Sequence, residues 1–93
     1  MDERRAVLGR VSGRVQGVAY RASLQREARA HRLTGWVRNL PDGRVEFLLQ
    51  GPPAAVQSVL DWASHGPPFA RVDAVESEDF PNPDLESFVI RYE

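Results

Sequence analysis

Along this chain, short segments with the hydrophobic periodicity of a strand alternate with short segments that have the periodicity of a helix. This alternation limits the folds that the chain can adopt. Apolar side chains alternate with polar ones over residues 6–13, as in a strand. Tyr20, Leu24 and Ala28 recur at helical spacing and predict a helix over residues 21–32. The complete prediction is strands at residues 6–13, 34–39, 44–51, 70–80 and 86–92, and helices at residues 21–32 and 52–65.

The segment between the second and third predicted strands has the composition of a turn. In LPDG, Pro41 presets the first corner, Asp42 tolerates the second and Gly43 can take a positive φ, so residues 35–50 are expected to form a hairpin. With runs this short, two helices can cover only one face of a sheet. The element order therefore predicts an α+β fold, a ferredoxin-like split βαβ sandwich with a five-stranded antiparallel sheet and two helices on one face. Residues 1–93 are expected to form a single domain.

Two glycines interrupt the first predicted strand and need an explanation. Gly9 and Gly13 would weaken it unless another group approaches the backbone closely. We therefore expect a close neighbour at these positions. The carboxylates of Asp42 and Glu46 lie in and just after the predicted turn, where they are expected to be solvated.

The composition excludes several kinds of site. The chain has no cysteine, so disulfides, thiolate metal sites and a cysteine nucleophile are ruled out. All twelve basic residues are arginine, so any cationic group in a site must be a guanidinium, which binds phosphate well and is no base at neutral pH. His31 and His65 fall in the last turns of the two predicted helices, where a cation favours the helix dipole. No metal site and no cofactor are expected.

Charge and hydropathy also limit the partners. The net charge of −1 argues against an extended nucleic-acid surface. No segment approaches the roughly 20 apolar residues that a membrane span requires. We expect a cytoplasmic protein that binds neither nucleic acid nor a membrane. Since no exposed apolar stripe calls for a partner, the expected state is a monomer.

The loop between the first strand and the first helix is the strongest candidate for a binding site. It reads Gly13-Arg14-Val15-Gln16-Gly17-Val18-Ala19-Tyr20-Arg21. A helix N-terminus exposes unpaired N–H groups and a partial positive charge, and Gly17 can turn successive amides toward one centre. Arg21, in the first helical turn, can add a planar fork to the same anion. These residues predict an anion cradle, although a plain strand–helix connection with a surface arginine would have the same composition.

Several motifs together resemble the acylphosphatase family. GRVQGVAYR at residues 13–21 is followed by GWVRN at residues 35–39, then by a hairpin, QGP and a closing SFVIRY. The resemblance runs from about Val7 to Tyr92. It implies that Arg21 binds substrate phosphate and that Asn39 positions the attacking water. It also implies that backbone amides complete the phosphate cradle, namely those of Gln16, Gly17, Val18, Ala19 and Tyr20.

The chain departs from the family pattern at two places. Tyr20 stands where phenylalanine is common, and its ring can still hold the loop against the core. Glu93 follows the usual terminal tyrosine, so two carboxylates end the chain. If that tail lay near Arg21, it would compete with phosphate.

The resemblance implies hydrolysis of acyl phosphates to a carboxylate and orthophosphate, with inorganic phosphate as product or inhibitor. No cofactor is implied. One alternative is a ferredoxin-like module that binds an anion without catalysis. Another is an accessory domain of a larger enzyme that handles acyl or carbamoyl phosphate, although the length of 93 residues favours a stand-alone protein.

Overall fold

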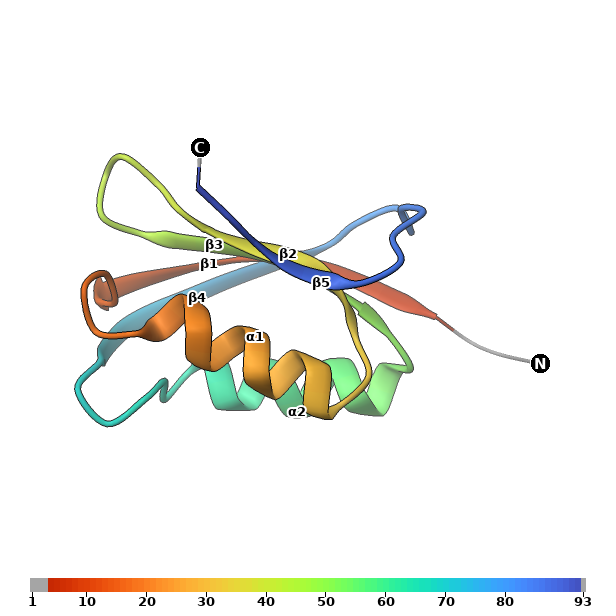
Figure 1. Cartoon of the computed structure of the whole chain (residues 1–93), viewed down its shortest axis with the longest axis horizontal. Helices are drawn as coiled ribbons and strands as arrows, with labels where there is room; N and C mark the ends of the chain where they lie inside the picture. Colours follow the sequence, from red (N-terminus) through yellow and green to blue (C-terminus); the bar gives the residue numbers. More distant parts are fainter. Residues whose placement is uncertain (1–3, 93) are drawn as a thin grey trace.

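The structure, a computed structural model, describes residues 4–92 (Figure 1). Its elements follow the predicted order, and most boundaries fall within one or two residues of the sequence prediction. They are β1 (Arg5–Arg14), α1 (Tyr20–Ala30), β2 (Thr34–Asn39), β3 (Val45–Gly51), α2 (Pro53–Ala63), β4 (Arg71–Asp79) and β5 (Phe88–Arg91). Within residues 4–92, neither helix has the length and hydropathy needed to cross a bilayer.

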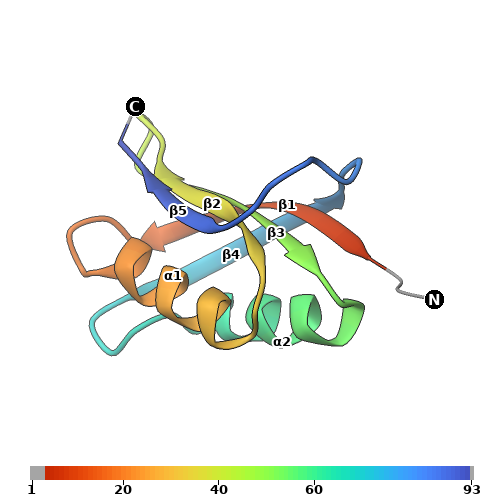
Figure 2. The ribbon, with the colours of Figure 1, turned by 45° about the vertical axis from the view of Figure 1, so that its right-hand side comes forward.

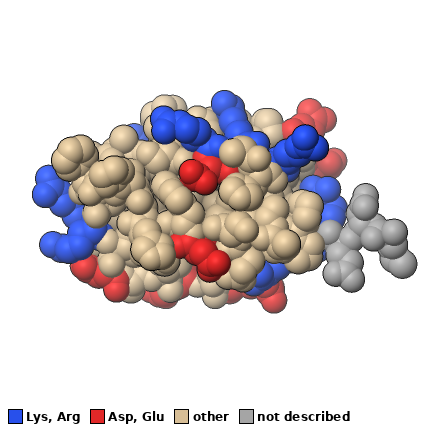
Figure 3. Space-filling view, turned by 90° about the horizontal axis from the view of Figure 1, so that it is seen from below, with Lys and Arg blue, Asp and Glu red and all other residues tan. Residues whose placement is uncertain are grey.

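The strands form one five-stranded sheet in the order β4-β1-β3-β2-β5. Both helices lie against the same face of this sheet, and the other face has no helix over it (Figure 2). The predicted ferredoxin-like sandwich is therefore confirmed. Seen from the helix side, acidic and basic side chains both lie mainly toward the rim, so this face does not carry a single sign of charge (Figure 3).

The prediction of a wholly antiparallel sheet is wrong for one strand. β5 runs parallel to β2, with Gly35 opposite Phe88, so the sheet is mixed. β4 ends beside the start of β1, and residues 80–87 then cross the end of the sheet to its opposite edge. β5 consequently begins at the end where β2 also begins. Hydrophobic periodicity indicates which side chains share a face, but not which strand lies alongside or in which direction.

Gln50 holds this crossing segment in place. Its side chain is 3% exposed, and its Nε2 donates hydrogen bonds to Asn82 Oδ1 at 3.2 Å and to the Pro83 carbonyl at 2.9 Å. Its Oε1 accepts a bond from the Thr34 hydroxyl at 3.0 Å. The amide therefore joins β3, β2 and the crossing segment at the end of the sheet where β2 begins.

The core lies between the helices and the sheet. The helical spacing read from the sequence is confirmed, since Tyr20, Leu24 and Ala28 of α1 are all buried. The buried residues of α2 are Val56, Val59 and Ala63. The sheet and its flanking segments contribute Val7, Val11, Val15, Leu33, Val37, Val45, Phe47, Leu49 and Phe88.

β3 is buried along its whole length, on both faces of the sheet. On the face without helices, Glu46 is only 5% exposed, so the expectation that it is solvated is wrong. Its carboxylate accepts a hydrogen bond from Arg10 Nε at 2.9 Å and another from Arg38 Nε at 2.8 Å. The neighbouring strands β1 and β2 supply these two arginines. Cross-strand pairing therefore buries the Glu46 carboxylate and gives it two cationic partners, although its position in the sequence is close to the turn.

The register brings the ends of β1 and β2 together. Both strands run antiparallel to β3, and Val45 lies opposite Val11 of β1 and opposite Asn39 of β2. β1 and β2 therefore point the same way on either side of β3. The loop that follows β1 and the last residue of β2 meet at one end of the sheet.

Close neighbours explain the two glycines of β1, as expected. A Cβ built on Gly9 would lie 2.3 Å from Cζ of Phe47, the residue opposite it on the neighbouring strand β3, whose ring covers the glycine. A Cβ on Gly13 would lie 2.1 Å from the carbonyl oxygen of Arg71, at a φ of +126° where the β1–β4 register shifts. The first strand needs both glycines for packing and for a bulge.

Gly9→Ala should lower the free energy of unfolding by about 1–3 kcal/mol, because the new methyl group overlaps the Phe47 ring in a filled core. Chemical denaturation followed by tryptophan fluorescence measures the change. In a Phe47→Leu background, where the far end of the ring is gone, the same substitution should cost less. An equal cost in both backgrounds would contradict this account.

Candidate functional site

The loop from Val15 to Ala19 joins β1 to α1 and presents the N-terminus of the helix. Gly17 and Ala19 both take positive φ values, +75° and +64°. Ala19 is the N-cap of α1, and no side chain makes a capping hydrogen bond there. The first turn contains no acidic residue. This helix start therefore keeps its unpaired amides and its partial positive charge, the conditions that favour an anion.

A pocket of about 160 Å³ lies beside this loop. It brings together five of the residues singled out from the sequence, namely Gly17, Ala19, Tyr20, Arg21 and Asn39. Gln16 and Val18, also predicted for the cradle, are not among the residues that line it. The remaining lining residues are Val15, Ala22, Ile90 and Tyr92. Two separate sequence motifs thus meet at one pocket.

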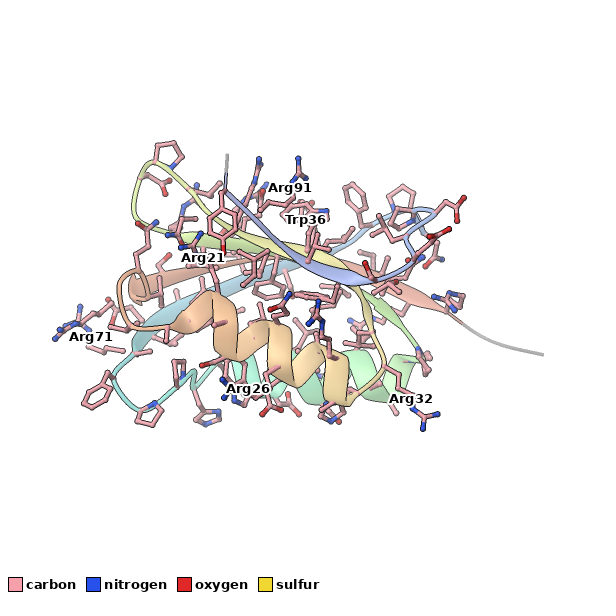
Figure 4. All side chains as sticks on the ribbon, viewed as in Figure 1. Arg21, Arg26, Arg32, Trp36, Arg71 and Arg91 are labelled. Carbon is pink, nitrogen blue, oxygen red and sulfur yellow. The ribbon has the colours of Figure 1, made fainter. Side chains whose placement is uncertain are left out.

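Arg21 supplies the positive charge of the pocket. It is the second residue of α1 and extends from the start of the helix on the side away from Arg26 (Figure 4). Its guanidinium carbon lies 4.9 Å from the centre of the Tyr92 ring, a cation–π contact that orients the side chain. No carboxylate within residues 4–92 forms an ion pair with it. Glu93, considered above as a competitor for this charge, lies outside the described residues.

Asn39 contributes a polar side chain to the pocket from the end of β2. Its Oδ1 is buried, and no donor within the described part of the chain reaches it. A buried amide oxygen without a partner carries a cost of about 1–3 kcal/mol. This oxygen is therefore ready to accept a hydrogen bond from a molecule that enters the pocket.

Tyr20 fixes the beginning of α1. Its hydroxyl donates a hydrogen bond to the Ala63 carbonyl at 2.8 Å, and its ring packs against Trp62 with 5.6 Å between centroids. Burial raises the pKa of the Tyr20 hydroxyl well above its usual value of 10. The hydroxyl therefore stays protonated at neutral pH and anchors the start of α1 to α2.

The sequence did not predict the wall of the pocket that Ile90 and Tyr92 provide. Both residues belong to the closing SFVIRY segment, which was interpreted as a strand and as part of the family resemblance, with no role at the site. They reach the pocket because β5 pairs with β2, the strand that ends in Asn39. Periodicity could not identify that neighbour. The one feature of the sequence that could have indicated this wall is the aromatic Tyr92 at the end of the segment.

The histidines take the structural positions expected of them. Nδ1 of His31 lies 2.9 Å from the Glu27 carbonyl, and Nδ1 of His65 lies 3.0 Å from the Asp61 carbonyl, both at helix ends. Neither histidine lines the pocket. Within residues 4–92, no three side chains of histidine, aspartate or glutamate gather in a way that could hold a metal ion.

Comparison with known proteins links this geometry to one family. The sequence model of the acylphosphatase family matches residues 7–90. An acylphosphatase of Anaeromyxobacter dehalogenans is 55% identical over 83 residues, which are 88% of this chain and 89% of that protein. An acylphosphatase of Thermococcus kodakarensis is 49% identical over 81 residues, 87% of this chain and 89% of that protein.

The solved structure of an acylphosphatase from Coxiella burnetii has the same fold. It superimposes with a TM-score of 0.92 at 36% sequence identity, over 95% of this chain and 93% of the other. The sequence and the fold of this chain thus match those of the compared acylphosphatases over nearly their full length. The chain belongs to the acylphosphatase family.

Proposed function

We propose that this chain hydrolyses the carboxyl–phosphate bond of acyl phosphates, releasing a carboxylate and orthophosphate. One observation carries the assignment of roles: an arginine with no carboxylate partner within residues 4–92 and a buried asparagine oxygen that no described donor reaches line the same pocket beside a helix N-terminus. The first can hold a phosphoryl group and the second a water. Together they supply the two components of a hydrolysis.

The phosphoryl group is bound by Arg21 and by the loop amides of residues 16–20. The guanidinium can meet two phosphoryl oxygens at once, and amides at the start of α1 can donate to the third. The positive φ values of Gly17 and Ala19 give the loop the curvature of an anion nest. These donors stabilise the charge on the equatorial oxygens as the transition state forms.

The attacking water is held by Asn39. Its Oδ1 accepts a hydrogen bond from the water and so fixes the water oxygen relative to phosphorus, which is catalysis by positioning. An amide suits this place because it brings no negative charge near the phosphoryl group. The water oxygen bonds to phosphorus while the bond from phosphorus to the carboxyl oxygen breaks.

Proton transfer in this scheme uses no protein base. The departing carboxylate is a good leaving group and needs no protonation. The proton of the attacking water passes to a phosphoryl oxygen of the substrate, which leaves as orthophosphate. The pocket lining supports this scheme, because none of the described residues that line it carries a carboxylate or an imidazole.

The chain is proposed to act as a cytoplasmic monomer, with an acyl phosphate as its partner and no nucleic acid, membrane or cofactor involved. The absence of cysteine suits a reducing compartment. Charges of both signs along the helix-covered face do not favour a polyanion.

The competing possibility is a module that binds an anion without turnover. Benzoyl phosphate distinguishes the two, because its hydrolysis is followed by loss of ultraviolet absorbance. The purified protein should hydrolyse it well above the uncatalysed rate, and equally in the presence of a chelator. Binding of inorganic phosphate without hydrolysis would favour the module.

Arg21→Gln should lower kcat/KM for benzoyl phosphate by about 10³-fold or more, because it removes the guanidinium that stabilises the transferring group. Inhibition by inorganic phosphate should weaken in parallel. Arg21→Lys is the matched control: it keeps the charge but loses the planar fork, so it should recover only part of the activity. Full activity in Arg21→Gln would exclude the proposed role.

Asn39→Ala should lower kcat by about 10²-fold while leaving phosphate inhibition largely intact, because it removes the group that positions water. Asn39→Asp keeps the shape but adds a negative charge. It should lower kcat and also weaken phosphate inhibition. If Asn39→Ala kept a kcat near that of the wild type, the positioning role would be wrong.

A further inference from the structure

We infer that the side chain of Gln16 is a positioning residue, which locks the phosphate loop to the β2–β3 turn and so sets the distance between Arg21 and Asn39. This inference rests on the proposed function and concerns the Gln16 side chain, whereas the cradle involves only its backbone amide. Gln16 does not line the pocket. Its effect on the reaction therefore has to pass through the two segments that it connects.

The contacts of Gln16 are specific to the turn. Its Nε2 donates one hydrogen bond to the Leu40 carbonyl and another to the Arg44 carbonyl, both at 2.9 Å. An amide nitrogen carries two hydrogens, so both are used. Leu40 and Arg44 also close the turn themselves, since the Leu40 N–H donates to the Arg44 carbonyl at 2.8 Å.

The two carbonyls are fully occupied by this arrangement. The Leu40 oxygen also accepts the N–H of Gly43 at 3.1 Å, and the Arg44 oxygen also accepts that of Leu40. Each oxygen thus receives two donors, one from the turn and one from Gln16. Both N–H groups of the part-buried Gln16 amide are hydrogen-bonded at the mouth of the turn, which makes the join between loop and turn rigid.

The location of the join gives it a consequence for the reaction. Leu40 directly follows Asn39, while Gln16 lies in the loop that leads into α1, five residues before Arg21. The proposed phosphate ligand and the proposed water ligand belong to different segments, separated by β3 in the sheet. A shift of about 1 Å between such groups can cost 10²-fold in rate. By holding the loop before α1 against the residue after Asn39, Gln16 limits movement of Arg21 relative to Asn39.

Gln16→Met tests the inference, because methionine has a similar length and no donor for the two carbonyls. The expected result is a kcat for benzoyl phosphate at least 10-fold lower, with the inhibition constant for inorganic phosphate within about twofold of the wild type. This split is expected because the cradle survives while its alignment with Asn39 is lost. An unchanged kcat would overturn the inference, and so would an equal loss of phosphate affinity.

Gln50→Met is the matched control. Gln50 also donates two hydrogen bonds from an amide that the fold encloses, but at the opposite end of the sheet from the pocket. It should reduce resistance to denaturant while leaving kcat unchanged. If Gln50→Met lowered kcat as much as Gln16→Met, the effect would be general destabilisation, and the inference would fail.

A second variant covers the case in which Gln16→Met does not fold. In Gln16→Glu, an ionised carboxylate cannot donate, whereas a protonated carboxyl can donate one O–H to a carbonyl. The kcat of Gln16→Glu relative to the wild type should therefore rise as pH falls, and a flat ratio would contradict the inference. If the wild type itself fails to hydrolyse benzoyl phosphate, the proposed function is wrong; if only these variants behave otherwise, the inference about Gln16 alone is wrong.

Discussion

Burial of β3 on both of its faces is the constraint on which the rest of this structure depends. A strand enclosed in this way needs a neighbour on each side, and β1 and β2 both pair with it in the antiparallel sense. They must then run in the same direction, so the loop after β1 and the last residue of β2 emerge together. The site is a direct product of this pairing, since Val45 is the shared partner of Val11 and Asn39. Core packing and placement of the pocket therefore have the same origin.

The chemistry of the pocket follows from how its charges are balanced. Buried Glu46 is matched by two arginines on the face without helices, whereas Arg21 has an aromatic ring beside it and no carboxylate within residues 4–92. A ring orients a guanidinium without neutralising it. The chain thus uses some arginines to stabilise the sheet and keeps Arg21 available for an anion. A site made of a cation, amides and one neutral side chain suits a reaction limited by charge and position.

The sequence predicted the elements because they depend on local periodicity, and the resemblance to the acylphosphatase family indicated the two segments that the structure brings together at the pocket. The buried face of α1 was predicted from the spacing of Tyr20, Leu24 and Ala28. The two glycines of β1 predicted that another group packs closely against Gly9 and Gly13. What it could not supply depends on contacts between distant segments. The parallel pairing of β5, the burial of Glu46 and the place of Tyr92 at the pocket are decided by which strands become neighbours. Neither periodicity nor spacing encodes that choice.

The short strand β5 has a consequence for how the protein is made. Ile90 of β5 and Tyr92, just after it, line the pocket together with Gly17 and Ala19, which lie far away in the sequence. Contacts between such distant positions are the slowest to form in a folding chain. During synthesis, the phosphate loop can exist long before the pocket is enclosed. The pocket is not complete until the chain has been made as far as Tyr92, so any hydrolysis by this site begins only after synthesis has passed that residue.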